Sequence, residues 1–338
     1  MKRNPTMKDV AKVAGVSVMT VSRAFKQEAS VGEETRKNIQ DTAELLGYVF
    51  DSSAANLRSQ RSNFVAVTIP SLNSPNFAAT VEALTTALSS AGYQVLLGHT
   101  NYDIQREEEL IAEFLRRKPE AIVVTGGRHT DKARKMLAAS GVPVVETWDL
   151  PENPIDHVVG FSNAAVVTPL VNHLVAKGLT QIGFIGGDTD CDTRGIDRRL
   201  GFIRAMEAHN LSAERLVGSG VPQQPMRDGG IAMAQLLERF PQTQAVICVS
   251  DAVGFGALSE CQRRGISVPD EMAIVGFGAY DISEVCVPSL TTIDPQSKDI
   301  GAMAAQLVID VLVEPKTGLR HAIEPALRVG GSSGNSMG

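Results

Sequence analysis

The chain has 338 residues, of which 43% are hydrophobic and 21% charged, and its net charge is −6. This length predicts two or three folded units, and the composition argues against wholesale disorder. No apolar run approaches the ~20 residues that a membrane helix needs, and the basic N-terminus does not lead into the apolar stretch of a secretory signal. We therefore expect a cytoplasmic protein with no membrane partner.

Charge is distributed unevenly along the chain. Residues 1–62 hold ten Lys and Arg against seven Asp and Glu, a net charge of +3, whereas the remainder carries −9. A small basic head on an acidic body places the attraction for phosphates at one end only. The N-terminal segment is therefore the part expected to meet nucleic acid.

The first fifty residues predict three helices. Thr6 is suited to cap the first, Gly15 to end it in a left-handed turn, and Ser17 to cap a second helix over residues 18–25. A third helix is expected over roughly residues 33–46. Two short helices joined by a glycine-containing turn are the geometry of a helix-turn-helix, although a three-helix bundle with no DNA role would share it.

The residue pattern in this head is more specific than its helices. The run Lys8-Asp9-Val10-Ala11-x-x-Ala14-Gly15-Val16-Ser17-x-x-Thr20-Val21-Ser22-Arg23 resembles the DNA-binding signature of the LacI/GalR family of bacterial repressors. Val31, Thr35-Arg36 and Leu46-Gly47-Tyr48 match that family's third helix at the same spacing. The resemblance implies that the second helix enters the major groove of double-stranded operator DNA. The implied DNA-binding residues are Thr6, Ser17, Val18, Met19, Thr20, Ser22, Arg23, Thr35 and Arg36.

These residues would play two different parts. By the resemblance Val18 and Met19 face the bases, where apolar side chains favour thymine methyl groups, and Arg23 can reach a guanine or a phosphate. The hydroxyl residues and Arg36 would mostly anchor phosphates, which positions the head but carries little sequence information. For Ser22 a solvated helix hydroxyl is an equal alternative.

A polar, Ser-rich segment at residues 51–62 is the expected hinge. It is too short to form a stable helix alone in water. In the resembled family this segment folds on DNA and a leucine enters the minor groove, and Ala54 and Leu57 occupy the corresponding positions. The alternative is a passive linker with Leu57 packed on the following domain.

From Phe64 onward short apolar runs alternate with helical patterns, which predicts an α/β fold with parallel sheets. Two groups of strands fit two subdomains better than one very wide sheet. A ligand would bind in the cleft at the carboxyl ends of the strands. The expected strands are 64–69, 94–98, 121–125, 142–146, 157–160, 181–185, 245–248, 272–277 and 290–293, with helices at 77–91, 105–116, 164–176, 195–209 and 251–264.

The same stretch is similar to the periplasmic-binding-protein-like core of the LacI/GalR family. The resemblance implies that helix 77–91 contributes to a homodimer, and the absence of a leucine heptad after residue 325 favours a dimer over a tetramer. The expected domains are a helix-turn-helix domain at 1–50, a hinge at 51–62, an effector-binding and dimerisation core at 63–330 and a flexible tail at 331–338. Within the core we expect one subdomain of about 63–162 plus 295–323 and another of 163–294 plus 324–330.

Several stretches, among them Gly126-Gly127-Arg128-His129-Thr130 and Val159-Gly160-Phe161-Ser162-Asn163, look closest to the gluconate-utilisation repressors of the family. Ligand contacts belong on the loops that follow strands. The resemblance implies effector contacts from Asn73, Asn76, Phe77, Glu146, Trp148, Phe161, Arg194, Arg198, Ser250, Asp251, Tyr280 and Gln296.

Two arginines stand out in this set because a guanidinium suits the two oxygens of a carboxylate. Arg194 and Arg198 are therefore the expected anion-binding residues, with a surface salt bridge to Asp192 or Asp197 as the equal alternative for Arg194. Trp148 would either stack on the ligand or fill the core.

The chain also departs from the family pattern at two positions. Many sugar-binding members carry Asp where this chain has Gly278, and Asn where it has Ser250. Loss of that Asp removes an acceptor for the hydroxyls of a neutral sugar and a negative charge that would repel an acid.

The sequence thus predicts a DNA-binding transcriptional repressor that binds a pseudo-palindromic operator. We expect a small sugar acid, gluconate or a related ketogluconate, to release it and so to control genes of sugar-acid catabolism. A family repressor that responds to a neutral sugar or another metabolite is the alternative.

An enzyme is not expected, because the chain has neither a G-x-G-x-x-G nor a G-x-x-x-x-G-K-[ST] phosphate loop nor an H-E-x-x-H zinc pattern. A transport binding protein would not need residues 1–62. No cofactor or metal is expected, since the four cysteines form no C-x-x-C pair.

Overall fold

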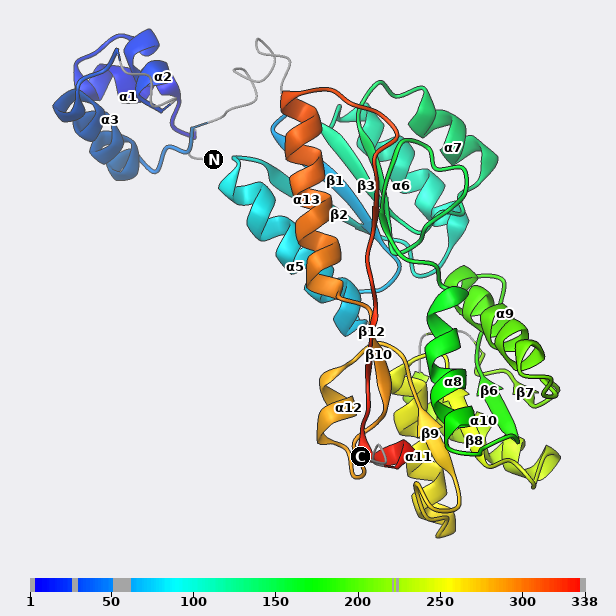
Figure 1. Ribbon diagram of the computed structural model, residues 1–338. Coiled ribbons are helices and arrows are strands. Elements are labelled where there is room, and N and C mark those ends of the chain that lie inside the picture. Colours follow the sequence, from blue (N-terminus) through cyan, green and yellow to red (C-terminus); the bar gives the residue numbers. More distant parts are fainter. Residues whose placement is uncertain (1–3, 26–29, 51–61, 221, 223–224, 335–338) are drawn as a thin grey trace. The chain divides into compact units, whose positions relative to one another are not determined.

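The computed structural model describes residues 4–25, 30–50, 62–220, 222 and 225–334 (Figure 1). The chain divides into two compact units, Met1–Arg61 and Ser62–Gly338, which are described in turn.

In the described part of the first unit, three helices form the head: α1 (Met7–Ala14), α2 (Val18–Phe25) and α3 (Glu33–Leu46). Its small core contains Val10, Val21 and Ile39, each fully buried, one from each helix. Gly15 has a φ of 69° and ends α1 in the left-handed conformation that glycine adopts without steric cost. The predicted helical head and its turn are confirmed.

The second unit begins with a six-stranded sheet in the order β11-β5-β4-β3-β1-β2, in which every neighbouring pair is parallel. Alternate residues of β1 face opposite sides, as the strand repeat of two requires: Val65 and Val67 belong to the cluster with α5 and α13, and Ala66 to the cluster with α6 and α7. The strands are β1 (Phe64–Ile69), β2 (Gln94–His99), β3 (Ala121–Thr125), β4 (Val144–Thr147), β5 (His157–Gly160) and β11 (Arg320–Ala322); the helices are α5 (Pro75–Ser90), α6 (Ile104–Arg116), α7 (Asp131–Ala138) and α13 (Ser297–Val313).

A second, four-stranded parallel sheet has the order β7-β6-β8-β9. Its helices α10 and α11 approach closely because both carry glycines at the contact: a Cβ at Gly256 would lie 2.0 Å from the Met226 carbonyl oxygen. The elements are β6 (Ile182–Ile185), β7 (Leu216–Val217), β8 (Ala245–Cys248), β9 (Ala273–Val275), the 3-10 turn η1 (Ala165–Val167), α8 (Thr168–Ala176), α9 (Thr193–Ala208), α10 (Pro225–Arg239), α11 (Asp251–Arg264) and α12 (Asp281–Val285).

Three connections join the two sheets, after β5, after β10 (Thr292–Asp294) and between β11 and β12 (Ala326–Arg328). Two of them run side by side, because β10 and β12 form an antiparallel pair (Figure 1). The predicted α/β fold with parallel sheets is confirmed, and we propose these three connections as the boundaries between an N-terminal and a C-terminal subdomain.

The structure differs from the expected flexible tail over residues 331–334. Residues Gly331–Ser333 form a 3-10 turn in which Ser332 and Ser333 are buried. The Ser332 hydroxyl donates to the Ile274 carbonyl oxygen and accepts the Thr291 N–H, so the turn closes the edge of β9. A Gly/Ser composition suggests disorder because it offers little apolar surface, but here hydroxyl groups supply the contacts. Residues 335–338 lie outside the described part.

The same turn carries a G-x-S-x-G sequence at residues 330–334. The Ser332 oxygen is buried and already bonded to backbone, whereas a nucleophilic serine of that pattern would be exposed on a sharp turn after a strand. The pattern therefore has a packing role in this chain.

Candidate functional site

A cavity of about 770 Å³ lies between the two subdomains, at the carboxyl ends of their parallel strands. One wall comes from the segments after β1, β2 and β4, and the other from the first turns of α9 and the segments after β7, β8 and β9. Because both subdomains contribute walls, a molecule in this cavity would touch both at once.

Two arginines one helical turn apart on α9 line the cavity. Arg194 is 6% exposed and its guanidinium carbon lies 5.4 Å from the centre of the Phe77 ring. The guanidinium of Arg198 lies 4.0 Å from the centre of the Phe277 ring and donates to the Val249 carbonyl oxygen at 2.7 Å. Burial lowers the pKa of Arg198. The site therefore holds two cationic donors that are largely buried by protein groups.

The carboxylates that the sequence offers as partners for Arg194 are used elsewhere. Asp192 accepts the Gly195 N–H at 3.1 Å and caps α9, and Asp197 pairs with Arg128. Among the residues that the structure describes, no ion pair or hydrogen bond to the Arg194 guanidinium occurs. Its charge is therefore available to a ligand, although Asp192 also lines the cavity.

Two tyrosines add hydroxyl groups to the cavity wall. Burial raises the pKa of Tyr102 well above its usual range, against the opposing effect of Arg194. Burial also raises the pKa of Tyr280, whose hydroxyl lies 3.5 Å from the Ser74 hydroxyl of the opposite wall. Both phenols stay neutral and can donate to or accept from a ligand's hydroxyl groups.

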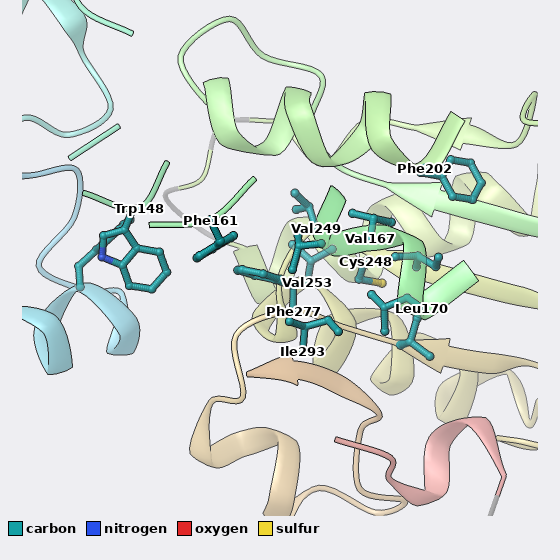
Figure 2. Packing of buried hydrophobic residues seen from close by; sticks show 14 of the residues in the cluster. Trp148, Phe161, Val167, Leu170, Phe202, Cys248, Val249, Val253, Phe277 and Ile293 are labelled. Carbon is teal, nitrogen blue, oxygen red and sulfur yellow. The ribbon is translucent and has the colours of Figure 1, made fainter. Parts of the chain in front are cut away.

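An aromatic series runs from one subdomain to the other (Figure 2), and three of its members, Phe77, Trp148 and Phe277, line the cavity. Trp148 meets Phe77 with ring centres 5.2 Å apart, and Phe161 lies 6.0 Å from both Trp148 and Phe277. The Trp148 indole N–H donates to the Thr80 hydroxyl at 3.2 Å. Trp148 thus lines the cavity and packs in the core, so both interpretations of this residue describe part of its surroundings.

The structure brings eight of the twelve predicted effector residues to the cavity wall. They are Asn73, Asn76, Phe77, Trp148, Arg194, Arg198, Ser250 and Tyr280. Of the other four, Phe161 lies behind Trp148, and Gln296 precedes α13 with its N–H bonded to Asp294 at 2.8 Å. Neither residue lines the cavity.

Glu146 and Asp251 also lie behind the wall, each held by protein groups. The Glu146 carboxylate is fully buried, accepts the Ile155 N–H at 2.6 Å and lies 3.5 Å from the ring of His129. Asp251 accepts the Thr292 hydroxyl at 2.6 Å and the Tyr280 N–H at 2.9 Å. Burial raises the pKa of Asp251 to about 6, although these hydrogen bonds oppose the shift. Asp251 therefore supports the loop that carries Tyr280.

Other residues of the wall were not singled out from the sequence, chiefly His99, Asn101, Tyr102, Ser219, Met226 and Phe277. Asn101 and Tyr102 come two and three residues after the end of β2, so their position after a strand was an available signal. Both adopt left-handed backbone conformations, with φ of 55° and 61°, which asparagine adopts readily but tyrosine seldom does. Ser219 follows β7, whose two residues give too short a pattern to recognise.

The position of Gly278 explains one departure from the family pattern. Its φ of +132° strains any larger residue, and a Cβ there would lie 2.6 Å from the Tyr280 ring. The space that a carboxylate would need is therefore occupied by Tyr280. This wall of the cavity presents a phenol in place of an acid.

In the head, the N-terminal end of α2 is open to solvent. Val18 and Met19 are 40% and 58% exposed, which is unusual for such side chains, and Arg23 is exposed on the same helix. Ser17 accepts the Thr20 N–H at 3.1 Å and so caps α2 as predicted. The end of the helix that would meet base edges thus presents apolar side chains framed by hydroxyl groups.

Two predicted DNA contacts have structural partners within the head. The Thr6 hydroxyl and N–H both donate to the Asp9 carboxylate, at 2.6 and 2.8 Å, at the start of α1. Arg36 donates to the carbonyl oxygens of Ala24 and Val31, which ties α3 to the end of α2 and its following loop. Arg36 therefore also holds the helices of the head together, a role that the sequence pattern did not predict.

Ser22 and Thr35 are half-buried, whereas Ala54 and Leu57 lie outside the described residues. Within the described ranges, no group of three or more His, Cys, Asp or Glu side chains is arranged to hold a metal ion. None of the helices that the structure describes combines the length and the apolar character that a membrane crossing requires.

Comparison with known proteins supplies the family. Residues 6–50 match the model of bacterial regulatory proteins of the lacI family, and residues 171–333 match a periplasmic binding protein-like domain. The HTH-type transcriptional regulator GntR of Pseudomonas aeruginosa is 36% identical over 308 residues, which cover 91% of this chain and 89% of that protein. The HTH-type transcriptional regulator IdnR of Escherichia coli K12 is 31% identical over 304 residues, which cover 90% and 91% of the two chains.

Solved structures agree with these relatives. A LacI family transcriptional regulator from Silicibacter pomeroyi is 36% identical, has a TM-score of 0.77 and covers 81% of this chain and 100% of its own. A second regulator from Silicibacter pomeroyi is 30% identical, has a TM-score of 0.89 and covers 98% of this chain and 100% of its own. The chain belongs to the lacI family of bacterial regulatory proteins and is a DNA-binding transcriptional repressor.

Proposed function

We propose that this repressor binds a pseudo-palindromic operator as a homodimer and is released by a small sugar acid, gluconate or a related ketogluconate. It would thereby control genes of sugar-acid catabolism. The observation that carries the proposal is the pair Arg194 and Arg198, two largely buried guanidinium groups on one wall of the cavity. No carboxylate within the described residues forms an ion pair with either of them.

A buried cation without an anionic partner is costly, so its presence calls for an anion. A carboxylate fits a guanidinium through two parallel hydrogen bonds, which are stronger than neutral ones. The remaining wall offers amide and hydroxyl groups from Asn73, Ser250 and Tyr102, which suit a polyhydroxylated chain. Gly278 adds no acid at the point where many sugar-binding members of the family carry one.

Release from DNA requires that the effector bind two states of the protein unequally. A ligand that touches both walls favours the closed cavity, and closure would move the N-terminal subdomain and so disfavour the ordered hinge. A coupling free energy on the order of 1–3 kcal/mol is typical for such linkage. The hinge residues Ala54 and Leu57 lie outside the described residues, and their ordering on DNA stays part of the proposal.

The head supports the DNA side of the proposal. The exposed apolar pair Val18 and Met19 at the start of α2 fits contact with thymine methyl groups in a major groove. One head covers one half-site only, so a specific operator requires two heads in a symmetric pair. This is the reason for proposing a homodimer.

Calorimetric titration of the full chain tests the effector. The panel contains gluconate, 2-ketogluconate and 6-phosphogluconate together with several neutral sugars. The proposal expects binding of a sugar acid and no binding of the neutral sugars. Binding of a neutral sugar alone would contradict the sugar-acid assignment and favour the alternative of a repressor that responds to a neutral metabolite.

A further inference from the structure

We propose that Arg128 is a positioning residue that latches the two subdomains together beside the effector cavity and so sets the affinity for the effector. The inference rests on the proposed function in one respect, namely that the effector favours the closed cavity. Arg128 follows β3 in the N-terminal subdomain. Its guanidinium pairs with the Asp197 carboxylate and donates to the Thr193 carbonyl oxygen at 3.3 Å. Both partners belong to α9 of the C-terminal subdomain.

The loop that presents Arg128 is fixed by the next residue. The His129 ring is fully buried, with Nδ1 2.7 Å from a Glu107 oxygen and Nε2 3.5 Å from a Glu146 oxygen. These two carboxylates come from α6 and β4, so the ring joins the loop to two separate elements of the sheet and its cover. The contact between Nδ1 and Glu107 is a hydrogen bond, whereas Nε2 and the Glu146 oxygen that faces it make none. Arg128 is therefore presented toward α9 from a loop that the buried ring anchors to α6.

The contacts of Arg128 with Asp197 and Thr193, called the latch below, hold the part of α9 that carries the two anion-binding arginines. Thr193 directly precedes Arg194, and Asp197 directly precedes Arg198. Gly126, at the start of the same loop, has a φ of +99°, and a Cβ there would lie 2.9 Å from Nη1 of Arg194. The loop and the first turn of α9 are thus in close contact.

Arg128 nevertheless lies outside the wall of the large cavity. It lines a second cavity of about 430 Å³ together with Glu107, Cys191 and Arg194. Arg194 is shared by both cavities, so the latch lies next to the effector site without forming its wall. Arg128 would act on the effector through the arrangement of α9.

The exposure of the pair indicates where its effect would be seen. The Arg128 side chain is 47% exposed and that of Asp197 is 17% exposed, and ion pairs near the surface add little to the stability of a fold. Each partner sits on a different subdomain, so the pair contributes only when the cavity is closed. Its loss should weaken effector binding by about two- to fivefold and leave each subdomain folded.

The experiment compares the full chain with Arg128→Gln, Asp197→Asn, the double variant and the charge swap Arg128→Asp with Asp197→Arg. The control is Arg106→Gln, which breaks the exposed Arg106–Glu109 pair inside one subdomain. Calorimetry with gluconate and 2-ketogluconate should show equal losses for both single variants, no further loss in the double variant and recovery in the swap. Operator affinity of the unliganded protein should not fall.

A second readout needs no effector. Cys191 lines the smaller cavity beside the latch and is half-buried, whereas Cys248 and Cys261 are buried. In a Cys286→Ser background, loss of the latch should raise the rate at which a thiol reagent modifies Cys191, and the Arg106 control should not. Unchanged thiol rates in both single variants, or failure of the swap to restore them, would overturn the latch. If no sugar acid binds at all, the proposed effector fails while the thiol rates still decide the latch.

Discussion

Replacing Arg194 by Met separates effector binding from the stability of the fold. The side chain is 6% exposed and contacts the face of Phe77, but no carboxylate among the described residues forms an ion pair with it. Methionine has a similar length and apolar stem, so the change removes the charge while largely keeping the packing. The two expected effects have opposite directions.

The expected loss of affinity follows from the strength of a charge-assisted contact. Removing such a contact costs about 1.5–3 kcal/mol, which is roughly a 10- to 200-fold increase in Kd for a sugar acid. In the unliganded protein the same guanidinium is a buried cation without an acidic partner. Its removal should therefore leave the free energy of unfolding unchanged or raise it.

Two measurements on the full chain decide the matter, with Arg204→Met as the matched control. Arg204 is exposed on the same helix and lies outside the cavity wall. Calorimetry gives the affinity for gluconate, and denaturant unfolding gives the stability. The single tryptophan, Trp148, reports on the cavity by fluorescence. The reasoning fails if Arg194→Met keeps full affinity for the sugar acid but lowers the unfolding free energy by more than about 2 kcal/mol.

Three further predictions follow from the same structure. Burial lowers the pKa of His129, but the carboxylates of Glu107 and Glu146 outweigh it and raise the pKa to about 9. Protonated His129 should therefore stabilise the fold by on the order of 3 kcal/mol below pH ~6.5, and this stabilisation should be lost as the pH rises through about 9. Denaturant unfolding between these two pH values should show the free energy of unfolding falling as the pH rises, and the His129→Gln variant should not show this fall. Gly126→Ala places a methyl group against Arg194 in a strained backbone, so calorimetry should show weaker effector binding, and unaltered affinity would contradict the close contact. Leu57→Ala should weaken operator binding in an anisotropy titration and leave effector affinity on free protein intact, whereas unchanged operator affinity would refute the minor-groove role.

Much of the fold follows from local patterns. The bounds of α2, α3, β1 and β3 agree with the prediction because capping residues and glycines mark the helix ends, and apolar runs mark the buried strands. The cavity arginines could also be predicted from the sequence, since they follow β6 at the start of a helix. The short strand β7 and the polar strand β11 could not be predicted, because neither has enough residues or apolar character to form a pattern.

Side-chain partners that are distant in sequence could not be inferred in the same way. Glu146 is the last residue of the strand predicted at 142–146, where a ligand contact was expected, yet β4 continues to Thr147 and the neighbouring His129 lies on another loop. Ser332 belongs to a Gly/Ser tail by composition, but its hydroxyl forms hydrogen bonds with the Ile274 carbonyl oxygen and the Thr291 N–H. In both cases the tertiary contact decides the role, and a single sequence does not show that contact.

Operator release by a sugar acid is the most direct test of the account. An operator duplex is first selected from random DNA with the full chain, and its binding is then followed by fluorescence anisotropy while gluconate or 2-ketogluconate is added. The account predicts that one sugar acid releases the DNA at a concentration near its calorimetric Kd, and that Arg194→Met raises that concentration by the same factor as the Kd. Release by a neutral sugar alone, or binding of a sugar acid that leaves operator affinity unchanged, would contradict it.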